Sequence, residues 1–202
     1  MKIIKYEKKS NGKYLLYLDN NEKVELYEDT ILKNNLLYKK EINKKELSTL
    51  IEDNNISNIY NKCINYISVR IRSTKEIYDY LKKYTTDEDL IEEIIDKLTK
   101  NKLLNDSSFA GAFVKDKWHF TTMGPYRIKN ELKIHNISNE IIEEEINKIS
   151  EEEIITKLEK QLNKIIKSTK KKETLRNKAY NNLISLGYSI DNVLEIINKY
   201  NL

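Results

Sequence analysis

A repeat of 51 residues constrains the fold of this chain more than any other feature of its sequence. When the sequence is shifted by 51 residues, the same apolar residue types return twice. The positions that recur are Leu81, Leu132 and Leu183 in one case, and Ile95, Ile146 and Ile197 in the other. Self-similarity at a fixed period of this length is typical of repeat proteins, in which each unit packs on its neighbours.

Each repeat unit predicts three helices, because apolar residues recur at helical spacing and the chain contains only 4 Gly and 1 Pro. The predicted helices span 57–68, 73–84 and 87–101 in the first unit, 106–120, 124–135 and 138–149 in the second, and 151–168, 171–186 and 190–200 in the third. Three-helix units in tandem predict an elongated, curved array that offers a long surface rather than a pocket.

The predicted helix ends carry residues that favour those positions. Thr86, Ser138 and Ser189 each precede an apolar periodic run, so we expect them to act as N-caps. Pro125 falls in the first turn of a helix, where its missing N–H costs little. Gly187 stands where a left-handed C-terminal cap is expected.

Residues 1 to about 30 follow a different pattern, which predicts β-strands. Apolar and aromatic runs at 3–6, 14–18 and 24–27 are separated by polar turns. The pair Asn11-Gly12 between two such runs is a strong hairpin signal. The expected fold class is therefore mainly α, with three tandem three-helix repeats and a small N-terminal antiparallel β element. The expected domain limits are 1–45, 46–105, 106–150 and 151–202.

The composition excludes several classes of protein. No apolar run is long enough for a transmembrane helix, and the N-terminus lacks the apolar core of a signal peptide. Cys63 is the only cysteine, so neither an intramolecular disulfide nor a cysteine zinc cluster can form. The sequence also lacks a Gly-rich phosphate loop and a defensible nucleophile–base pair. We expect a cytoplasmic monomer that is not an enzyme and holds no cofactor or metal.

Charge varies along the repeat, although the formal net charge is only +4. The middle helix of each unit is basic, and the third helix of the first two units is acidic. A stripe of stacked basic helices suits nucleic acid or an acidic protein surface. Solvated surface charge, with acidic residues favoured at helix N-termini, explains the same pattern. The candidate contact residues are Arg70, Arg72, Lys82, Lys83, Arg127, Lys129, Lys133, Arg176 and Lys178.

Three segments resemble the RecX family, regulators of the RecA recombinase. Residues 67–73 (ISVRIRS), followed by Glu76 and Leu81, are similar to the signature of the family's first repeat. Residues 103–110 (LLNDSSFA) resemble the entry to its second repeat, and residues 124–132 (GPYRIKNEL) resemble the helix that follows. The resemblance covers nearly the whole chain. It departs from the family pattern at Trp118-His119-Phe120, which is more aromatic than the usual basic stretch.

The resemblance implies a partner and an activity. RecX-like proteins lie in the groove of the RecA filament on single-stranded DNA and mostly inhibit ATP hydrolysis and strand exchange. The implied partner is the RecA filament, with contacts to single-stranded or double-stranded DNA and none to a membrane. The repeats can span neighbouring protomers of a helical polymer, so that modest contacts add up by multivalency. A stand-alone nucleic-acid-binding protein and a protein-interaction scaffold are the alternatives.

Overall fold

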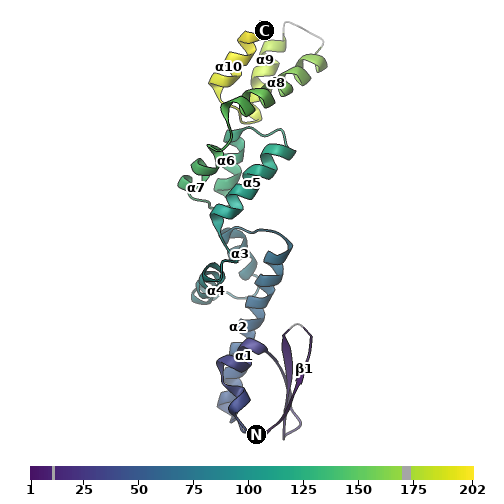
Figure 1. Cartoon of the computed structure of the whole chain (residues 1–202), viewed down its shortest axis with the longest axis vertical. Coiled ribbons are helices and arrows are strands. Elements are labelled where there is room, and N and C mark those ends of the chain that lie inside the picture. Colours follow the sequence, from purple (N-terminus) through teal and green to yellow (C-terminus); the bar gives the residue numbers. More distant parts are fainter. Residues whose placement is uncertain (11, 170–173) are drawn as a thin grey trace. The chain divides into compact units, whose positions relative to one another are not determined.

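The computed structural model of the chain describes residues 1–10, 12–169 and 174–202. The chain is mainly helical, with a small antiparallel sheet at the N-terminus, as the sequence predicts (Figure 1). It divides into two compact units. The first comprises residues 1–70 and 80–94, and the second comprises residues 71–79 and 95–202.

The N-terminal sheet has three strands in the order β1-β2-β3, and both pairs are antiparallel. The strands are β1 (Ile3–Lys8), β2 (Lys13–Leu18) and β3 (Lys23–Tyr27). In the predicted turn between β1 and β2, Gly12 has a φ of 68°, which glycine adopts without strain. Asn11, the other half of that signal, lies outside the described residues. The buried face of the sheet contributes to one core, made of Leu16, Leu18, Leu26, Ile31, Leu36, Ile42 and Leu50.

Two short helices follow the sheet, and the first of them begins within the region, residues 1 to about 30, for which the sequence predicts strands. They are α1 (Glu28–Lys33) and the 3-10 helix η1 (Leu36–Tyr38). The next helix, α2 (Lys44–Val69), begins well before the predicted residue 57. A capping box between Asn43 and Glu46 fixes its start.

Polar side chains connect the first half of α2 to the sheet and to α1. Leu50 of this half belongs to the N-terminal core, and hydrogen bonds add to that contact. The Asn54 side chain accepts a hydrogen bond from the Tyr27 amide at 2.8 Å and donates one to the Glu25 carbonyl at 2.9 Å. Thr30 of α1 is fully buried and donates from Oγ1 to Ser57 Oγ at 3.0 Å.

The repeat region contains each of the predicted helices. The remaining helices of the first unit are α3 (Thr74–Leu81) and α4 (Glu88–Lys100). The second unit has α5 (Asp106–Phe120), α6 (Pro125–Ile134) and α7 (Asn139–Ile146). The third has α8 (Glu151–Ser168), α9 (Leu175–Ser185) and α10 (Ile190–Lys199). The start predicted for α9, at residue 171, lies outside the described residues.

The 51-residue period is also the period of burial. Three positions of the unit carry fully buried apolar side chains in all three repeats. These are Ile77, Ile128 and Ala179; Leu81, Leu132 and Leu183; and Ile91, Ile142 and Val193. The repeated sequence pattern therefore encodes a repeated core.

Two of the three predicted N-caps are confirmed. Ser138 and Ser189 each accept a hydrogen bond from the backbone amide three residues later, at 3.4 Å and 3.1 Å. The prediction for Thr86 is wrong, because α4 begins one residue later than expected. Asp87 accepts the capping hydrogen bond instead, from the Leu90 amide at 3.2 Å. Asp87 is also the residue that a shift of 51 positions aligns with Ser138.

The second and third repeats meet through backbone at two glycines. The Gly124 amide donates to the Leu186 carbonyl at 2.7 Å, and the Tyr126 amide donates to the Gly187 carbonyl at 3.0 Å. Gly187 has a φ of 93°, as the predicted left-handed cap requires. A Cβ atom on Gly187 would lie 2.5 Å from Arg127 Cβ, and one on Gly124 would lie 2.5 Å from the Gly187 carbonyl oxygen. Only glycine permits this approach at both positions.

We expect Gly187→Asn to lower the free energy of unfolding by about 1–3 kcal/mol, because the new side chain would overlap Arg127. Asn136 provides the matched control, since it occupies the same position of the second repeat with a φ of 56°. Asn136→Gly should change the free energy of unfolding by less than about 1 kcal/mol. Urea denaturation measures both variants, and equal losses would contradict the assignment of the contact to Gly187.

Candidate functional site

The predicted basic residues of α6 include cations that are exposed in the folded chain. Arg127 and Lys133 are exposed, and within the described residues neither forms an ion pair or a hydrogen bond through its side chain. Lys129 is different, because its Nζ lies 2.6 Å from Glu143 Oε2. Arg127 and Lys133 are six residues apart, which places them about 120° apart around the helix axis. The cations of this helix therefore occupy more than one face.

The repeat relates two pairs of these candidates. A shift of 51 residues aligns Lys82 with Lys133, and it aligns Arg127 with Lys178. Lys178 is exposed on α9, and Lys82 is exposed next to the end of α3. Lys82 forms an ion pair with Glu88 at the start of α4.

Arg72 has a structural role that its charge alone did not reveal. Its side chain is only 11% exposed, and its Nη1 lies 3.6 Å from Glu76 Oε1. Glu76 in turn accepts a hydrogen bond from the Ser73 amide at 3.2 Å. Arg72 thus belongs to the network that starts α3, where its substitution would alter stability as well as surface charge.

The other three candidates lie at the ends of elements. Arg70 is exposed at the C-cap of α2. Lys83 is exposed just beyond α3, with its Nζ 5.6 Å from the centre of the Tyr80 ring. Arg176 donates hydrogen bonds to the Leu202 carbonyl and, at 3.2 Å, to Asn198 Oδ1. Arg176 therefore holds α9 to the end of the chain.

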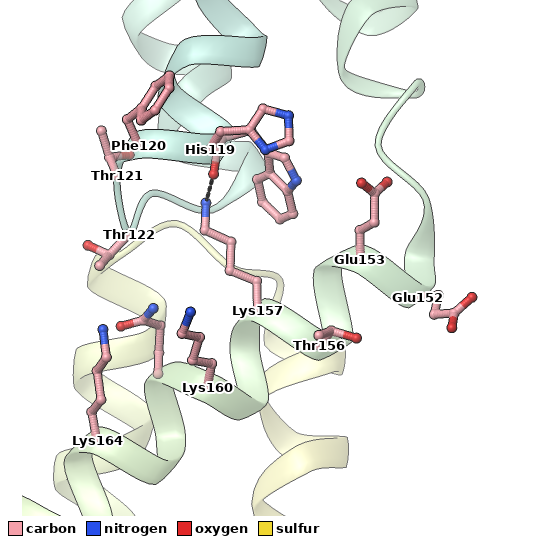
Figure 2. A pocket seen from close by; sticks show the side chains of 12 residues that line it. His119, Phe120, Thr121, Thr122, Glu152, Glu153, Thr156, Lys157, Lys160 and Lys164 are labelled. Atoms are coloured by element: carbon pink, nitrogen blue, oxygen red, sulfur yellow. Dashed lines mark hydrogen bonds between the residues drawn. The ribbon is translucent and has the colours of Figure 1, made fainter.

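A cleft that the sequence analysis did not foresee lies between the end of α5 and the side of α8 (Figure 2). Its volume is about 570 Å³. Figure 2 shows Lys157, Lys160 and Lys164 extending from α8 toward the end of α5, while Glu152 and Glu153 project from the first turn of α8. The cleft therefore has an acidic end and a longer basic side.

Lys157 connects the two helices that form the cleft. Its Nζ donates to the Trp118 carbonyl at 2.5 Å and to the Met123 carbonyl at 3.1 Å, and it lies 3.8 Å from the centre of the Trp118 ring. The last carbonyls of a helix lack partners and attract cations, which explains the position of this ammonium at the end of α5. Burial lowers the pKa of Lys157 to about 8.

Three further lysines continue along α8 and form what we call the α8 lysine row, Lys160, Lys164 and Lys167. Steps of four and three residues place them on one side of the helix. All three are exposed, and none forms an ion pair within the part of the chain that the structure describes. The spacing of the lysines at 157, 160, 164 and 167 is visible in the sequence.

Comparison with known proteins identifies the family. Models of the first and second three-helix domains of RecX match residues 60–98 and 105–145. The Regulatory protein RecX of Streptococcus gordonii is 33% identical over 189 residues, which cover 94% of this chain and 73% of the relative. That of Listeria welshimeri is 33% identical over 193 residues, covering 94% and 72%. The chain belongs to the RecX family of regulatory proteins.

Solved structures agree with the RecX assignment. A crystal structure of regulatory protein RecX matches 98% of this chain and 98% of its own, with a TM-score of 0.85 and 23% identity. RecX from Lactobacillus salivarius matches 73% of this chain and 97% of its own, with a TM-score of 0.67 and 30% identity. The expected mainly helical repeat fold with an N-terminal sheet is thereby confirmed.

The RecX domain models end before α8, so the α8 lysine row lies outside both of them. In the described residues, no three side chains of the types His, Cys, Asp and Glu gather closely enough to hold a metal ion. None of the described helices combines the length and the apolar character needed to cross a membrane.

The pH dependence of stability tests the position of Lys157. Its folded pKa of about 8 lies below its ordinary value of 10.5, so between these values the unfolded chain binds more protons. The free energy of unfolding therefore rises with pH in this window. We expect the unmodified chain to gain stability relative to Lys157→Met from about pH 8 to about pH 10. Urea denaturation across this range measures the difference, and parallel profiles would show that burial does not perturb Lys157.

Proposed function

We propose that this RecX-family chain binds the RecA filament on single-stranded DNA and mostly inhibits ATP hydrolysis and strand exchange. The observation that carries the proposal is the similarity to Regulatory protein RecX over 94% of the chain. The repeated helical core supports it, because repeat units present similar surfaces at regular intervals. In this proposal the chain acts in the cytoplasm as a monomer, without catalysis of its own.

The energetics of the exposed cations favour a partner that is itself a repeating polymer. A single exposed ion pair contributes about 0–1 kcal/mol, which is too little for stable binding. Arg127, Lys133 and Lys178 are exposed on two successive repeats. Several such contacts along a filament add affinity by multivalency, against either acidic RecA surface or DNA phosphate. In this proposal the repeats comprise residues 46–105, 106–150 and 151–202, preceded by the β-containing region 1–45, and these three cations belong to the second and third repeats.

The direct test of this function is the rate of ATP hydrolysis by RecA on single-stranded DNA. We expect the rate to fall when the chain is added at less than one molecule per RecA protomer, because one bound molecule affects several protomers of a filament. Competition for DNA alone would require a larger excess. An unchanged rate, even at excess, would contradict the proposal.

Reversal of two exposed charges on different faces of α6 tests whether the cations of this helix contact the partner. We expect Arg127→Glu with Lys133→Glu to raise the concentration needed for half-maximal inhibition at least about tenfold, since each attraction becomes a repulsion. Arg72 is unsuitable for this test because of its ion pair with Glu76.

The matched control for the α6 variant is Lys40→Glu with Lys44→Glu. Both lysines are exposed and lie outside the three helical repeats. The two double variants lower the net charge by the same amount. If the α6 cations make a specific contact, only the α6 variant should need a higher concentration for half-maximal inhibition. Equal inhibition of RecA by both variants would show that Arg127 and Lys133 make no specific contact with the partner.

A further inference from the structure

We propose that Lys157 is a site of covalent modification, where a small acyl phosphate held by Lys160 and Lys164 transfers its acyl group to the Lys157 amine. This modification is separate from the proposed regulation of RecA, because it requires neither RecA nor DNA. The reagent is a small molecule, and the cleft between α5 and α8, with a volume of about 570 Å³, is large enough to admit it.

The Lys157 amine is held in a fixed position at the wall of this cleft. Its Nζ donates to the Trp118 carbonyl at 2.5 Å and to the Met123 carbonyl at 3.1 Å. A neutral amine has two N–H donors and one lone pair, so the two carbonyls occupy both donors and leave the lone pair for an electrophile. The side chain is half-buried and lines the cleft, so a small reagent in the cleft reaches the amine (Figure 2).

Burial keeps a larger share of this amine neutral than is usual for a lysine. The pKa of Lys157 is lowered from 10.5 to about 8. At pH 8 the amine is therefore neutral in about half of the molecules, against about 0.3% for a lysine with the ordinary pKa. Lysines act as nucleophiles where desolvation shifts their protonation in this direction.

Three other candidate nucleophiles each lack one of these properties. Cys63 is fully buried, and burial raises the pKa of its thiol to about 11. Lys148 is exposed, but its hydrogen bond to Glu145 raises the pKa of its amine. The hydrogen bond from Lys199 to Glu159 raises the pKa of Lys199 in the same way. These two lysines are accessible to a reagent and remain protonated, so they are poor nucleophiles.

Lys160 and Lys164 supply the charge that attracts a phosphate group into the cleft. They follow Lys157 by three and seven residues on the same side of α8, and both line the cleft (Figure 2). Both are exposed, and neither forms an ion pair within the part of the chain that the structure describes. Glu152 and Glu153 lie at the other end of the cleft, where they repel an anion. The phosphate is therefore drawn to the two lysines, next to the amine that receives the acyl group.

The transfer converts the Lys157 amine into an amide. The lone pair of the amine forms a bond to the acyl carbon, and the bond between that carbon and the phosphate oxygen breaks. Phosphate leaves with the electron pair of the broken bond and takes up one proton from the nitrogen. The products are the acylated lysine and inorganic phosphate, and nothing is oxidised or reduced.

Acylation changes the contact between the second and third repeats. An amide nitrogen of this kind carries a single N–H, so it donates to only one of the Trp118 and Met123 carbonyls. The positive charge that lies 3.8 Å from the centre of the Trp118 ring is also lost. The contact of α8 with the end of α5 therefore depends on whether Lys157 is acylated.

Acetyl phosphate is the probe for this site. The full chain is incubated with it at pH 8 and low salt, and peptide mapping by mass spectrometry follows the acetylation of each lysine. We expect Lys157 to be acetylated at least about tenfold faster than Lys148 and than the exposed Lys40 and Lys44, because more of its amine is neutral. Trp118 is the only tryptophan, and its emission should change in step with the acetylation of Lys157.

Variants separate the reactive amine from the phosphate site. Lys160→Gln with Lys164→Gln should slow acetylation of Lys157 by acetyl phosphate at least about fivefold, because the attraction for phosphate is lost. The same variant should keep its rate with acetic anhydride, which carries no charge. Lys40→Gln with Lys44→Gln makes the same change in net charge and should keep its rate with both reagents. Circular dichroism confirms that each variant is folded.

Three results would overturn the proposal. Acetylation of Lys157 no faster than that of Lys148 would show that the amine is not activated. Equal slowing by the two double variants would show that Lys160 and Lys164 hold no phosphate. Unchanged Trp118 emission in the acetylated chain would contradict the loss of the contact with α5. RecA is absent from every sample, so these outcomes are independent of the ATP-hydrolysis test.

Discussion

The hydrogen bond from the Gly124 amide to the Leu186 carbonyl, at 2.7 Å, is the contact on which the second half of the molecule depends. It joins the start of α6 to the turn after α9 through backbone alone, so no side chain can adjust to relieve a misfit. A second contact lies nearby, where Lys157 of α8 donates a hydrogen bond to the Trp118 carbonyl near the end of α5. These two contacts fix the position of α8 relative to α5, and the cleft lies between the two helices. The cleft is therefore a product of how two repeats meet.

The repeats were predictable because their information is local and periodic. Apolar positions such as Leu81, Leu132 and Leu183 recur in the sequence and are fully buried in the structure. Helix starts at Ser138 and Ser189 follow from the chemistry of a single side chain. The contacts that connect the N-terminal half of α2 to the sheet were not predictable in this way. The partners of this half are polar groups distant in the chain, and a hydrogen bond such as that from Tyr27 to Asn54 leaves no periodic signal.

The candidate site was harder to predict than the fold, for a related reason. Sequence shows that a residue is charged, but it does not show whether the charge is already neutralised. Arg72 and Lys129 are cations of the predicted stripe, and each has a carboxylate partner. The α8 lysine row has regular spacing in the sequence. Only the structure shows that the neighbouring Glu159 pairs with Lys199 of another helix. Pairing of this kind is a property of the folded chain.

Exposed cations spread over several helices and side chains gathered in a cleft gain affinity for a partner in different ways. Exposed cations on successive helices are individually weak and gain strength only from a partner that repeats. The cleft between α5 and α8, by contrast, gathers Lys160, Lys164 and the exposed ring of Phe120 in one place. In the proposed function, the exposed cations therefore gain from the repetition of a filament the affinity that a single copy of its surface could not supply.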